Sequence, residues 1–489
     1  MRVFGNGLFG ALTGLTLWVC CPTGGQAGTA EPSPHGLSIA SISAMVGVDV
    51  NLDDTGGYGL YASLPDIRSA LAWLGITQLR SGLPANADSN FQSYQQAAWI
   101  ESLSQSGDSF ALVFPHRDQG IAFETQQLDR LFAGVGGEFD GPPMRPGALR
   151  IIEGLNEIDN LSPSPGLAAA TTWQRQLFCL TRQADFCPAG SVDPHVAGAL
   201  VASFTSNGPV AATATPGAGF PADLANDHPY VMPSNNYQRS VLDTITDADT
   251  SVYGFNPLQG STIAGISTES GAYVEPTDAS RNDLGYLNGF DDGTRAIKVL
   301  DSLLDHVLLG QISYVYQLFD NYETPDNPVV DSDNRYGLFI ATGTTDAQGQ
   351  PGYIPTAAAT AIHNLLGFTA LPGVMASPGG NNCLPYTLAG LPDGAQSLLV
   401  QVNDSGTYAI VLWWDNPLDW NKDAHVPVPV SARPVTIDLA DDAFGWVFDA
   451  IGGGGPIAGF GGTSEISLAL GDDPLVVVVN TSNPGRACP

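Results

Sequence analysis

Short apolar segments that alternate with helical stretches are the feature that most constrains the fold of this chain. From about residue 40 to residue 368, each candidate strand is continuously apolar, which is typical of a parallel sheet buried on both faces. Parallel strands need crossover connections, and the segments between the candidates carry helical patterns. The predicted strands cover residues 44–50, 76–80, 110–115, 149–154, 209–215, 223–228, 262–268 and 312–318.

Eight repeats of strand and helix favour a (β/α)8 barrel over an open doubly wound sheet. Ser63 and Asp66 resemble a capping box at a helix start, and further helices are predicted over 293–309 and from Pro355 onward. One interval is irregular, because only about eight residues separate the fifth and sixth strands, too few for a full crossover helix. Either that unit is truncated or its strand is misassigned.

A different pattern begins after the stretch 371–382, which is rich in Pro, Gly and Asn. Six short strands are predicted beyond it, and an Asn-Asp-Ser-Gly turn joins the first two; they cover 397–402, 407–413, 435–439, 445–448, 465–470 and 474–479. The glycine-rich segment 452–462 is predicted to be a flexible hairpin connection. We therefore expect a catalytic barrel over 40–370 and a β-sandwich over 380–489.

The N-terminus has the organisation of a secretory signal peptide over residues 1–30. Arg2 precedes an apolar run from Leu8 to Cys20, and small residues follow around Ala27. No other apolar run approaches the roughly 18 residues of a membrane-spanning helix. We expect an exported chain, secreted or periplasmic, with no membrane span.

Four cysteines follow this leader, and an even number in an exported chain favours two disulfides. Three pairings are open. Proximity favours Cys179 with Cys187, which leaves Cys383 with Cys488 to join the two ends of the C-terminal unit. A zinc site is the competing interpretation, but no histidine stands at ligand spacing from these cysteines. We expect no metal and no cofactor.

The charge balance is strongly acidic, with 17 Lys and Arg against 49 Asp and Glu and a net charge of −32. Lys298 and Lys422 are the only lysines, so the chain lacks the clustered bases that nucleic acid or an anionic membrane requires. Such a surface suits an acidic medium, in which carboxylates are neutralised, or serves ordinary solubility. Only ten of the acids are Glu, which makes each Glu informative.

Two of these glutamates lie where a barrel places its chemistry, at the carboxyl ends of strands. Glu157 follows the fourth strand in Ile-Ile-Glu-Gly-Leu-Asn-Glu, and Glu269 follows the seventh in Ile-Ser-Thr-Glu-Ser-Gly. A barrel can bring these two ends together across its mouth. Two carboxyls about 5–5.5 Å apart are what a retaining glycosidase requires, one as nucleophile and one as acid. Either Glu alone is better interpreted as a solvated loop residue, but the pair favours catalysis.

These residues resemble the glycoside hydrolases of clan A, which carry Asn-Glu after strand four and Glu after strand seven. In this sequence the corresponding residues are Asn156-Glu157 and Glu269. The resemblance implies that Glu157 is the acid/base and Glu269 the nucleophile, and that Asn156 contacts a sugar hydroxyl. The barrel followed by a sandwich looks most like families 39, 30 and 79 of this clan.

Two further strand ends extend the resemblance. Arg80 ends the second strand, and His228-Pro229-Tyr230 ends the sixth, where clan members often have Arg and His-x-Tyr. By the same resemblance, Arg80 and Tyr230 would contact the nucleophile, and His228 would belong to the substrate-binding residues.

Other residues have two interpretations each. His116 ends the third strand and either contacts substrate or satisfies loop carbonyls, while Asp49 and Asn51 either contact a sugar hydroxyl or cap a loop. Three tryptophans near the sandwich strands, Trp413, Trp414 and Trp420, could form a carbohydrate platform, but core packing is favoured. The Asp-rich loop 320–333 lacks a calcium-loop pattern and is predicted to be a solvated lid.

The sequence therefore predicts a secreted retaining glycoside hydrolase that cleaves β-glycosidic bonds of an oligo- or polysaccharide without a cofactor. A transglycosylase on the same scaffold is the alternative among enzymes. A noncatalytic polysaccharide-binding envelope protein is the alternative from another class.

Overall fold

The computed structural model describes most of the chain after residue 35. The described residues are 36–52, 61, 63–84, 91–134, 142–161, 163–206, 220–231, 240–248, 264–274, 289–320, 336–345, 351–367, 383–402, 406–421 and 424–481. The predicted leader, the predicted strand 209–215, residues 321–333 of the Asp-rich loop and Cys488 lie outside them. Within the described part, no helix is long and apolar enough to cross a membrane.

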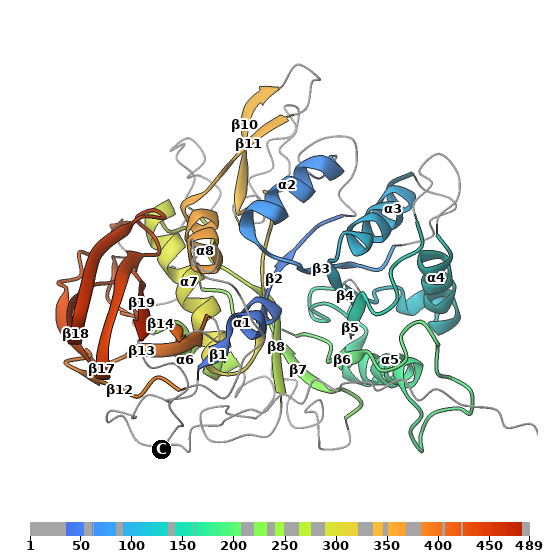
Figure 1. Cartoon of the computed structure of the whole chain (residues 1–489). Coiled ribbons are helices and arrows are strands. Elements are labelled where there is room, and N and C mark those ends of the chain that lie inside the picture. The colour runs from blue at the N-terminus through green and yellow to red at the C-terminus, as the bar shows by residue number, and fades with distance from the viewer. Residues whose placement is uncertain are drawn as a thin grey trace, which may run out of the picture.

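Eight parallel strands close into a barrel at the centre of the molecule, as predicted (Figure 1). Each strand pairs with the next along the chain, and the last pairs with the first. The strands are β2 (Val46–Asp49), β3 (Gln78–Gly82), β4 (Ser109–Val113), β5 (Leu149–Glu153), β6 (Leu200–Ala202), β7 (Leu224–Asp227), β8 (Ala264–Ser270) and β9 (Ile312–Val315).

The predicted position of the fifth barrel strand is wrong. That strand is β6, which spans three residues and pairs with β5 on one side and β7 on the other. It precedes the predicted segment 209–215, which lies outside the described residues. So short a strand carries almost no periodic signal, whereas the longer apolar run after it does. The irregular spacing in the sequence came from this misplacement.

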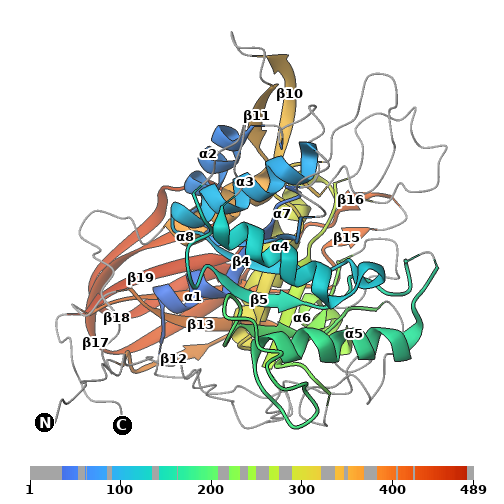
Figure 2. The same cartoon turned by 90° about the vertical axis from the view of Figure 1, so that its right-hand side faces the viewer.

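Helices surround the barrel strands (Figure 2). Ser63 caps α2 through its side chain, which accepts a hydrogen bond from the backbone N–H of Asp66 at 3.4 Å. The apolar face of α8 that the sequence predicts is buried, with Ala358, Ile362 and Leu365 against the core. The helices are α1 (Ile39–Met45), α2 (Leu64–Leu74), α3 (Phe91–Gln105), α4 (Ile121–Ala133), α5 (Gly166–Thr181), α6 (Val241–Ala248), α7 (Asp292–Leu308) and α8 (Ala357–Gly367).

The C-terminal region forms a sheet that folds over on itself into two layers beside α7 and α8 (Figure 1). Its strands are β12 (Tyr386–Ala389), β13 (Ala395–Gln401), β14 (Thr407–Trp414), β17 (Arg433–Asp449), β18 (Pro456–Leu470) and β19 (Leu475–Thr481). The long strand β17 joins the layers, because its first half pairs with β12 and its second half with β19. The register shifts between these halves, at Asp438/Ala443. The predicted sandwich is confirmed.

Three details of the sandwich differ from the prediction. The segments 435–439 and 445–448 belong to one strand, β17, and residues 456–462 of the glycine-rich segment belong to β18 rather than to a flexible connection. In addition, β1 (Leu37–Ser38), ahead of the barrel, pairs in parallel with β13. Two-stranded ribbons complete the fold: β10 (Phe339–Thr345) with β11 (Pro351–Pro355), which projects from the body in Figure 1, and β15 (Trp420–Asn421) with β16 (Val426–Pro427).

Strand β14 is buried on both faces, which explains its uninterrupted apolar sequence. Tyr408, Ile410 and Leu412 enter the core between the two layers. The alternate residues Ala409, Val411 and Trp413 join the large core shared with the barrel. The Trp413 indole N–H donates to Oδ1 of Asp305 on α7 at 2.9 Å. Trp413 therefore packs between the two units, as favoured by its position in a strand.

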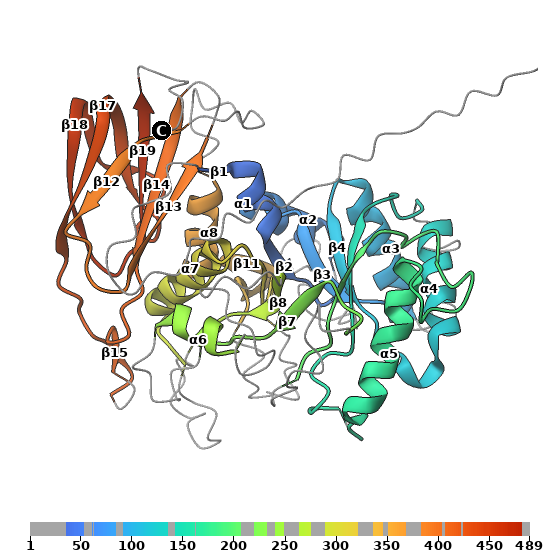
Figure 3. The ribbon, with the colours of Figure 1, turned by 90° about the horizontal axis from the view of Figure 1, so that it is seen from below.

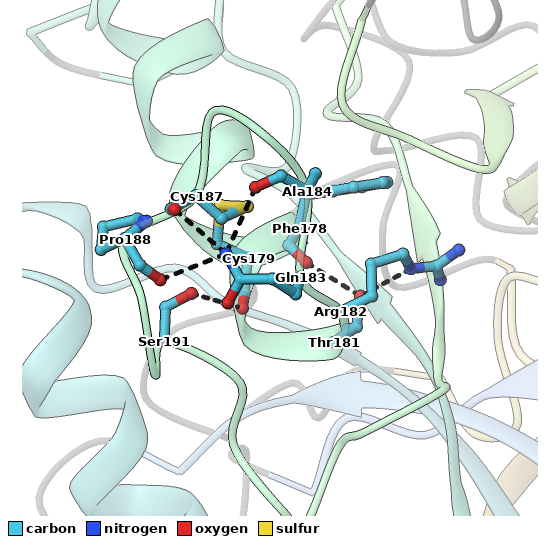
Figure 4. Close-up of a disulfide and its surroundings, with 9 residues drawn as sticks. All are labelled: Phe178, Cys179, Thr181, Arg182, Gln183, Ala184, Cys187, Pro188 and Ser191. Atoms are coloured by element: carbon cyan, nitrogen blue, oxygen red, sulfur yellow. Dashed lines mark hydrogen bonds between the residues drawn. A yellow bond between two sulfur atoms is a disulfide. The ribbon is translucent and has the colours of Figure 1, made fainter.

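One predicted disulfide is confirmed. Cys179, near the end of α5, and Cys187 are joined with a Cα–Cα distance of 5.4 Å, and the hydroxyl of Ser191 donates to the Cys179 carbonyl at 3.1 Å (Figure 4). This loop lies between α5 and β6, at the amino ends of the barrel strands. Cys383 is also disulfide-bonded. Its predicted pairing with Cys488 stays a prediction.

Candidate active site

Arg80 lies at the centre of a polar cluster at the carboxyl ends of the barrel strands. From β3, its guanidinium forms a bidentate pair with Glu153 of β5, with Nε–Oε2 at 2.8 Å and Nη2–Oε1 at 2.9 Å. Its Nη1 donates to Oδ1 of Asp49 on β2 at 2.9 Å and to Oε1 of Glu269 on β8 at 2.7 Å. Burial opposes its charge, but the three carboxyls raise the pKa of Arg80 well above its ordinary value.

A bulge in β8 directs Glu269 toward Arg80. Ser267 pairs with Ser313 and Ser270 with Val315, so β8 has one more residue than β9 over this stretch. A bulge of this kind changes the direction of the following side chains. As a result, both Thr268 and Glu269 reach the cluster, although neighbours in a regular strand point to opposite faces.

Glu269 is held in its ionised form. Burial alone would raise its pKa, but the positive field of His228 and Arg80, together with hydrogen bonds from Tyr230 and Arg80, lowers the pKa of Glu269 to about 2. The Tyr230 hydroxyl donates to Oε2 at 2.5 Å, opposite the oxygen that Arg80 contacts. Each oxygen of the carboxylate therefore has a donor.

Glu157 lies across from Glu269 on a strained turn after β5. Its φ of +40° is rare for a residue with a side chain. The turn is fixed by a hydrogen bond from the Glu157 N–H to the Thr205 hydroxyl at 2.8 Å. Oε2 of Glu157 accepts from Asn160 at 2.6 Å, and the side chain is more exposed than that of Glu269, at 21% against 9%. Strained backbone of this kind clusters at functional sites.

His228 connects the two glutamates. Its Nδ1 lies 3.0 Å from Oε1 of Glu157 and 3.5 Å from Oε2 of Glu269. Its Nε2 lies 3.0 Å from the Thr268 hydroxyl, which also contacts Oε1 of Glu153 at 3.0 Å. The imidazole is thus fixed on both sides, between Glu157 and Thr268.

A carboxylate oxygen of Glu157, a ring nitrogen of His228 and a carboxylate oxygen of Glu269 lie within 4.8 Å of one another. Such a set could hold a metal ion. However, both oxygens of Glu269 already accept hydrogen bonds, and the Arg80 guanidinium 2.7 Å from one of them repels a cation. The donor set therefore fits acid–base and nucleophilic chemistry better than metal coordination.

Tyrosine rings form one side of the site. Tyr230 packs edge to face with Tyr336, with ring centroids 5.3 Å apart, and Tyr336 packs in the same way with Tyr316 at 5.5 Å. Burial and the neighbouring Glu269 raise the pKa of Tyr230 well above its ordinary value, so this phenol stays a donor. The rings place an apolar wall beside an ionised carboxylate.

The structure brings together Arg80, Asn156, Glu157, His228, Tyr230 and Glu269. Asn156 accepts from Arg80 Nη2 at 2.9 Å. His116 instead pairs with Glu124, through its backbone N–H at 2.9 Å and its Nδ1 at 3.1 Å. The substrate contacts of His116 and Asn156 stay predictions.

Two residues of the cluster have roles that the sequence did not indicate. The Asp49 side chain neither caps a loop nor faces solvent, because it is buried against Arg80, while Asn51 donates to the side chain of Gln317. Glu153, the main partner of Arg80, stands in the same motif as Glu157 but was not predicted to take part. The signal was available, since an acidic residue directly after a buried Ile-Ile pair needs a buried cation.

The fold and these side chains together define a (β/α)8 barrel with a pair of carboxylates, one buried and one half-buried, at the carboxyl ends of its strands. No protein-family model and no curated protein sequence matches the chain. Solved structures similar to it include a glycoside hydrolase of family 5 from Bacteroides vulgatus ATCC 8482, with 10% identity and a TM-score of 0.45 over 89% of this chain and 87% of that one.

Two others are AbfB, a family 51 alpha-L-arabinofuranosidase from Bifidobacterium longum, and a Faecalibacterium prausnitzii beta-glucuronidase. The first is 11% identical, with a TM-score of 0.49 over 93% of this chain and 97% of that one. The second is 12% identical, with a TM-score of 0.40 over 67% and 49%. Similarities of this size do not determine an activity, which has to be argued from the residues of this chain.

Proposed function

We propose that this chain is a secreted retaining glycoside hydrolase that cleaves β-glycosidic bonds of an oligo- or polysaccharide by double displacement. The observation that carries the proposal is the approach of Glu157 to Glu269, with carboxylate oxygens within 4.8 Å. Retaining enzymes have carboxyls about 5–5.5 Å apart, whereas inverting enzymes need about 6.5–9.5 Å to admit a water between them. The sequence resemblance to clan A supports the β-linkage, and the predicted leader supports secretion.

In the first displacement, Glu269 attacks the anomeric carbon and forms a covalent glycosyl-enzyme ester, while the glycosidic C–O bond breaks. This role requires an ionised carboxylate, which the lowered pKa of Glu269 provides. Arg80 and Tyr230 hold the two oxygens of this carboxylate and so fix its direction.

Glu157 protonates the departing oxygen in this step. It is the more exposed of the two glutamates, as an acid must be to reach a leaving group on its way to solvent. In the second displacement, the ionised Glu157 takes a proton from water, which attacks the anomeric carbon and releases Glu269. His228, 3.0 Å from Oε1, orients Glu157 in both steps.

A transglycosylase would use the same residues, with a sugar hydroxyl in place of water. A polysaccharide-binding protein without turnover would keep the fold. It would not need two carboxyls of which one is buried and ionised and the other is more exposed. Product analysis with and without an added acceptor sugar distinguishes the transglycosylase from the hydrolase. Absence of turnover on the glycoside panel described below would support the binding protein.

The proposal is tested with a panel of activated aryl β-glycosides and the purified protein without its leader. We expect Glu269→Ala to lower kcat/KM by roughly 10³-fold or more on the substrate that is turned over, and Glu157→Ala to lower kcat strongly, because an activated leaving group needs little acid but the second displacement still needs a base. Azide should restore turnover of Glu157→Ala and give a β-glycosyl azide, because this anion attacks the anomeric carbon in place of water, releases Glu269 and needs no base. The matched control is Glu465→Gln, an exposed carboxyl of the sandwich, which should leave turnover as it is. An α-anomer as the first product, observed by NMR, would contradict double displacement.

A further inference from the structure

Three carboxyl groups share one guanidinium in the site. Asp49, Glu153 and Glu269 all contact Arg80, and their side chains are 3%, 0% and 9% exposed. If all three carried a charge, the guanidinium would compensate only one of three negative charges held away from water, and His228 faces only the charge of Glu269. Carboxylates this close together do not all ionise in such surroundings. One of the three therefore carries a proton.

Hydrogen bonding distinguishes the three. Glu153 accepts from Nε and Nη2 of Arg80 and from the Thr268 hydroxyl. Glu269 accepts from Arg80 on one oxygen and from Tyr230 on the other. Asp49 accepts from Arg80 on Oδ1 alone, while its Oδ2 is buried without a hydrogen-bond partner in the described structure. An ionised oxygen is costly to bury in this way.

We propose that Asp49 is a positioning residue that acts as a neutral carboxylic acid: its carbonyl oxygen Oδ1 holds Nη1 of Arg80 against Glu269, and its proton resides on Oδ2. The positive charge of Arg80 then pairs with the carboxylates of Glu153 and Glu269 alone. This inference rests on the proposed role of Glu269 as nucleophile.

The groups that face Asp49 agree with this assignment. Arg80 on β3 is the positive one, and Glu153 on β5 and Glu269 on β8 are acidic, while Tyr314 on β9 is a buried phenol. Burial raises the pKa of Asp49, Arg80 opposes this rise, and the two glutamates add to it, so that the pKa lies well above its ordinary value. Burial and Asp49 likewise raise the pKa of Tyr314, which therefore stays neutral.

A neutral Asp49 has a function that an ionised one would lack. Nη1 donates one N–H to Asp49 and the other to Glu269, so a charged Asp49 would share with the nucleophile the positive charge at this end of the guanidinium. It would also raise the proton affinity of Glu269, because the two negative charges repel each other. A protonated acid orients the guanidinium without either effect.

The protonation state is measured directly, without turnover, by infrared difference spectroscopy at pH 7.5. The spectrum of the wild-type protein minus that of the Asp49→Asn variant should show the carbonyl band of a protonated carboxyl. The matched control is Asp108→Asn, a buried aspartate just before β4, at the opposite ends of the strands, where burial raises the pKa to about 6. Asp108 is mostly ionised at pH 7.5, so the spectrum of the Asp108→Asn variant should keep the carbonyl band of the wild-type protein. Asp49→Ser gives the same difference should the Asn variant not fold. A band unchanged in the folded variant overturns the proposal.

Kinetics then test the positioning role. Asp49→Asn keeps a neutral acceptor at Oδ1, so we expect both limbs of the pH–rate profile to stay within about 0.3 units and kcat/KM to fall no more than about threefold. Asp49→Ala should lower kcat by roughly 10- to 100-fold, because it removes a hydrogen bond to a charged group. If Asp49 were ionised, its Asn variant would lower the pKa of Glu269 and move the acid limb of the profile to lower pH, which would refute the inference.

The two proposals can fail separately. A wild-type protein that hydrolyses no glycoside but shows the Asp49-dependent band loses the proposed function and keeps the protonated Asp49. A protein that turns over a glycoside through Glu269 but lacks that band keeps the function and loses the inference.

Discussion

The hydroxyl of Tyr230 donates a hydrogen bond of 2.5 Å to Oε2 of Glu269, on the side of the carboxylate that Arg80 leaves open. This bond favours the ionised form of Glu269 and contributes to its pKa of about 2. Through this bond, Tyr230, which follows β7, affects the ionisation of Glu269 on β8.

Replacing Tyr230 by Phe should raise the pKa of Glu269 and move the acid limb of the pH–rate profile to higher pH. We expect a shift of about one unit, since a hydrogen bond to a charged group contributes about 1.5 kcal/mol or more. The value of kcat/KM at its optimum should fall roughly 10- to 100-fold. The control is Tyr386→Phe in the sandwich, which should leave the limb in place. An unmoved acid limb in the Tyr230 variant would refute this role.

A second buried group of charges lies between the barrel and the sandwich, where α7 faces the end of β14 (Figure 3). Lys298 on α7 is 2.7 Å from Oδ2 of Asp419 and 3.7 Å from Oδ1 of Asp415. Asp301 and Asp305, also on α7, are fully buried beside it, and neither oxygen of Asp301 has a hydrogen-bond partner in the described structure. Four aspartates thus surround one lysine.

Burial and repulsion by Asp415 raise the pKa of Asp301 and of Asp305 well above the ordinary value, although Lys298 opposes the rise. The nearby His306 does not compensate, because burial lowers its pKa to about 4. The folded state binds the aspartate protons more tightly than the unfolded state. Their stabilisation is therefore complete below about pH 4, the unfolded value, and is lost as pH rises through the folded pKa.

We expect the aspartates to make the free energy of unfolding greater at pH 4 than at pH 8, although the burial of neutral His306 acts in the opposite direction. Asp301→Asn should remove part of this difference, by raising stability at pH 8 by about 1–3 kcal/mol and changing it little at pH 4. Urea unfolding at both pH values measures this, with the exposed Asp118→Asn as control. A chain that is less stable at pH 4 than at pH 8, with Asp301→Asn destabilising at both, would contradict the prediction and the adaptation to an acidic medium.

Removing the single cation of this group should have the opposite effect. Lys298→Met leaves buried carboxylates without their partner and should cost about 3–5 kcal/mol of stability at pH 7. The cost should shrink at pH 4, because the aspartates are then protonated. A loss that is equal at both pH values would show that Lys298 contributes packing alone.

The disulfide between Cys179 and Cys187 should contribute stability and no activity. It closes a loop with a sequence separation of 8, so replacing both cysteines by Ser should cost about 2–3 kcal/mol. Because the loop lies at the amino ends of the strands, kcat/KM should stay at the wild-type value. Thermal unfolding and aryl glycoside hydrolysis measure the two effects, and a large loss of kcat in the folded double variant would contradict this separation.

Much of the fold was predictable because buried parallel strands are continuously apolar. Seven barrel strands lie at or near their predicted positions, and strand β14 is recognisable since both of its faces are covered. Strand β6 was not predictable, because three residues carry no period. The join within β17 was also missed, since the sequence between its halves, Asp441 and Asp442 included, is typical of a turn.

The site was predictable to the extent that it depends on strand ends. Glu157 and Glu269 stand at those ends, and the sequence places both. The contact between Asp49 and Arg80 was not predictable, because it depends on the register in which β2 pairs with β3, where these two residues are partners. The direction of Glu269 also depends on a bulge that only the pairing of β8 with β9 reveals.

The central claim is that Glu269 forms a covalent bond to a sugar. The most direct test is mass spectrometry of the intact protein, and then of its peptides, after incubation with 2-deoxy-2-fluoro aryl glycosides of the sugar that is turned over. The fluorine slows both displacements and the activated leaving group restores the first, so the ester accumulates. We predict one sugar per chain, attached to Glu269. A sugar attached to Glu157, or unlabelled protein that still hydrolyses the parent glycoside, would contradict the account.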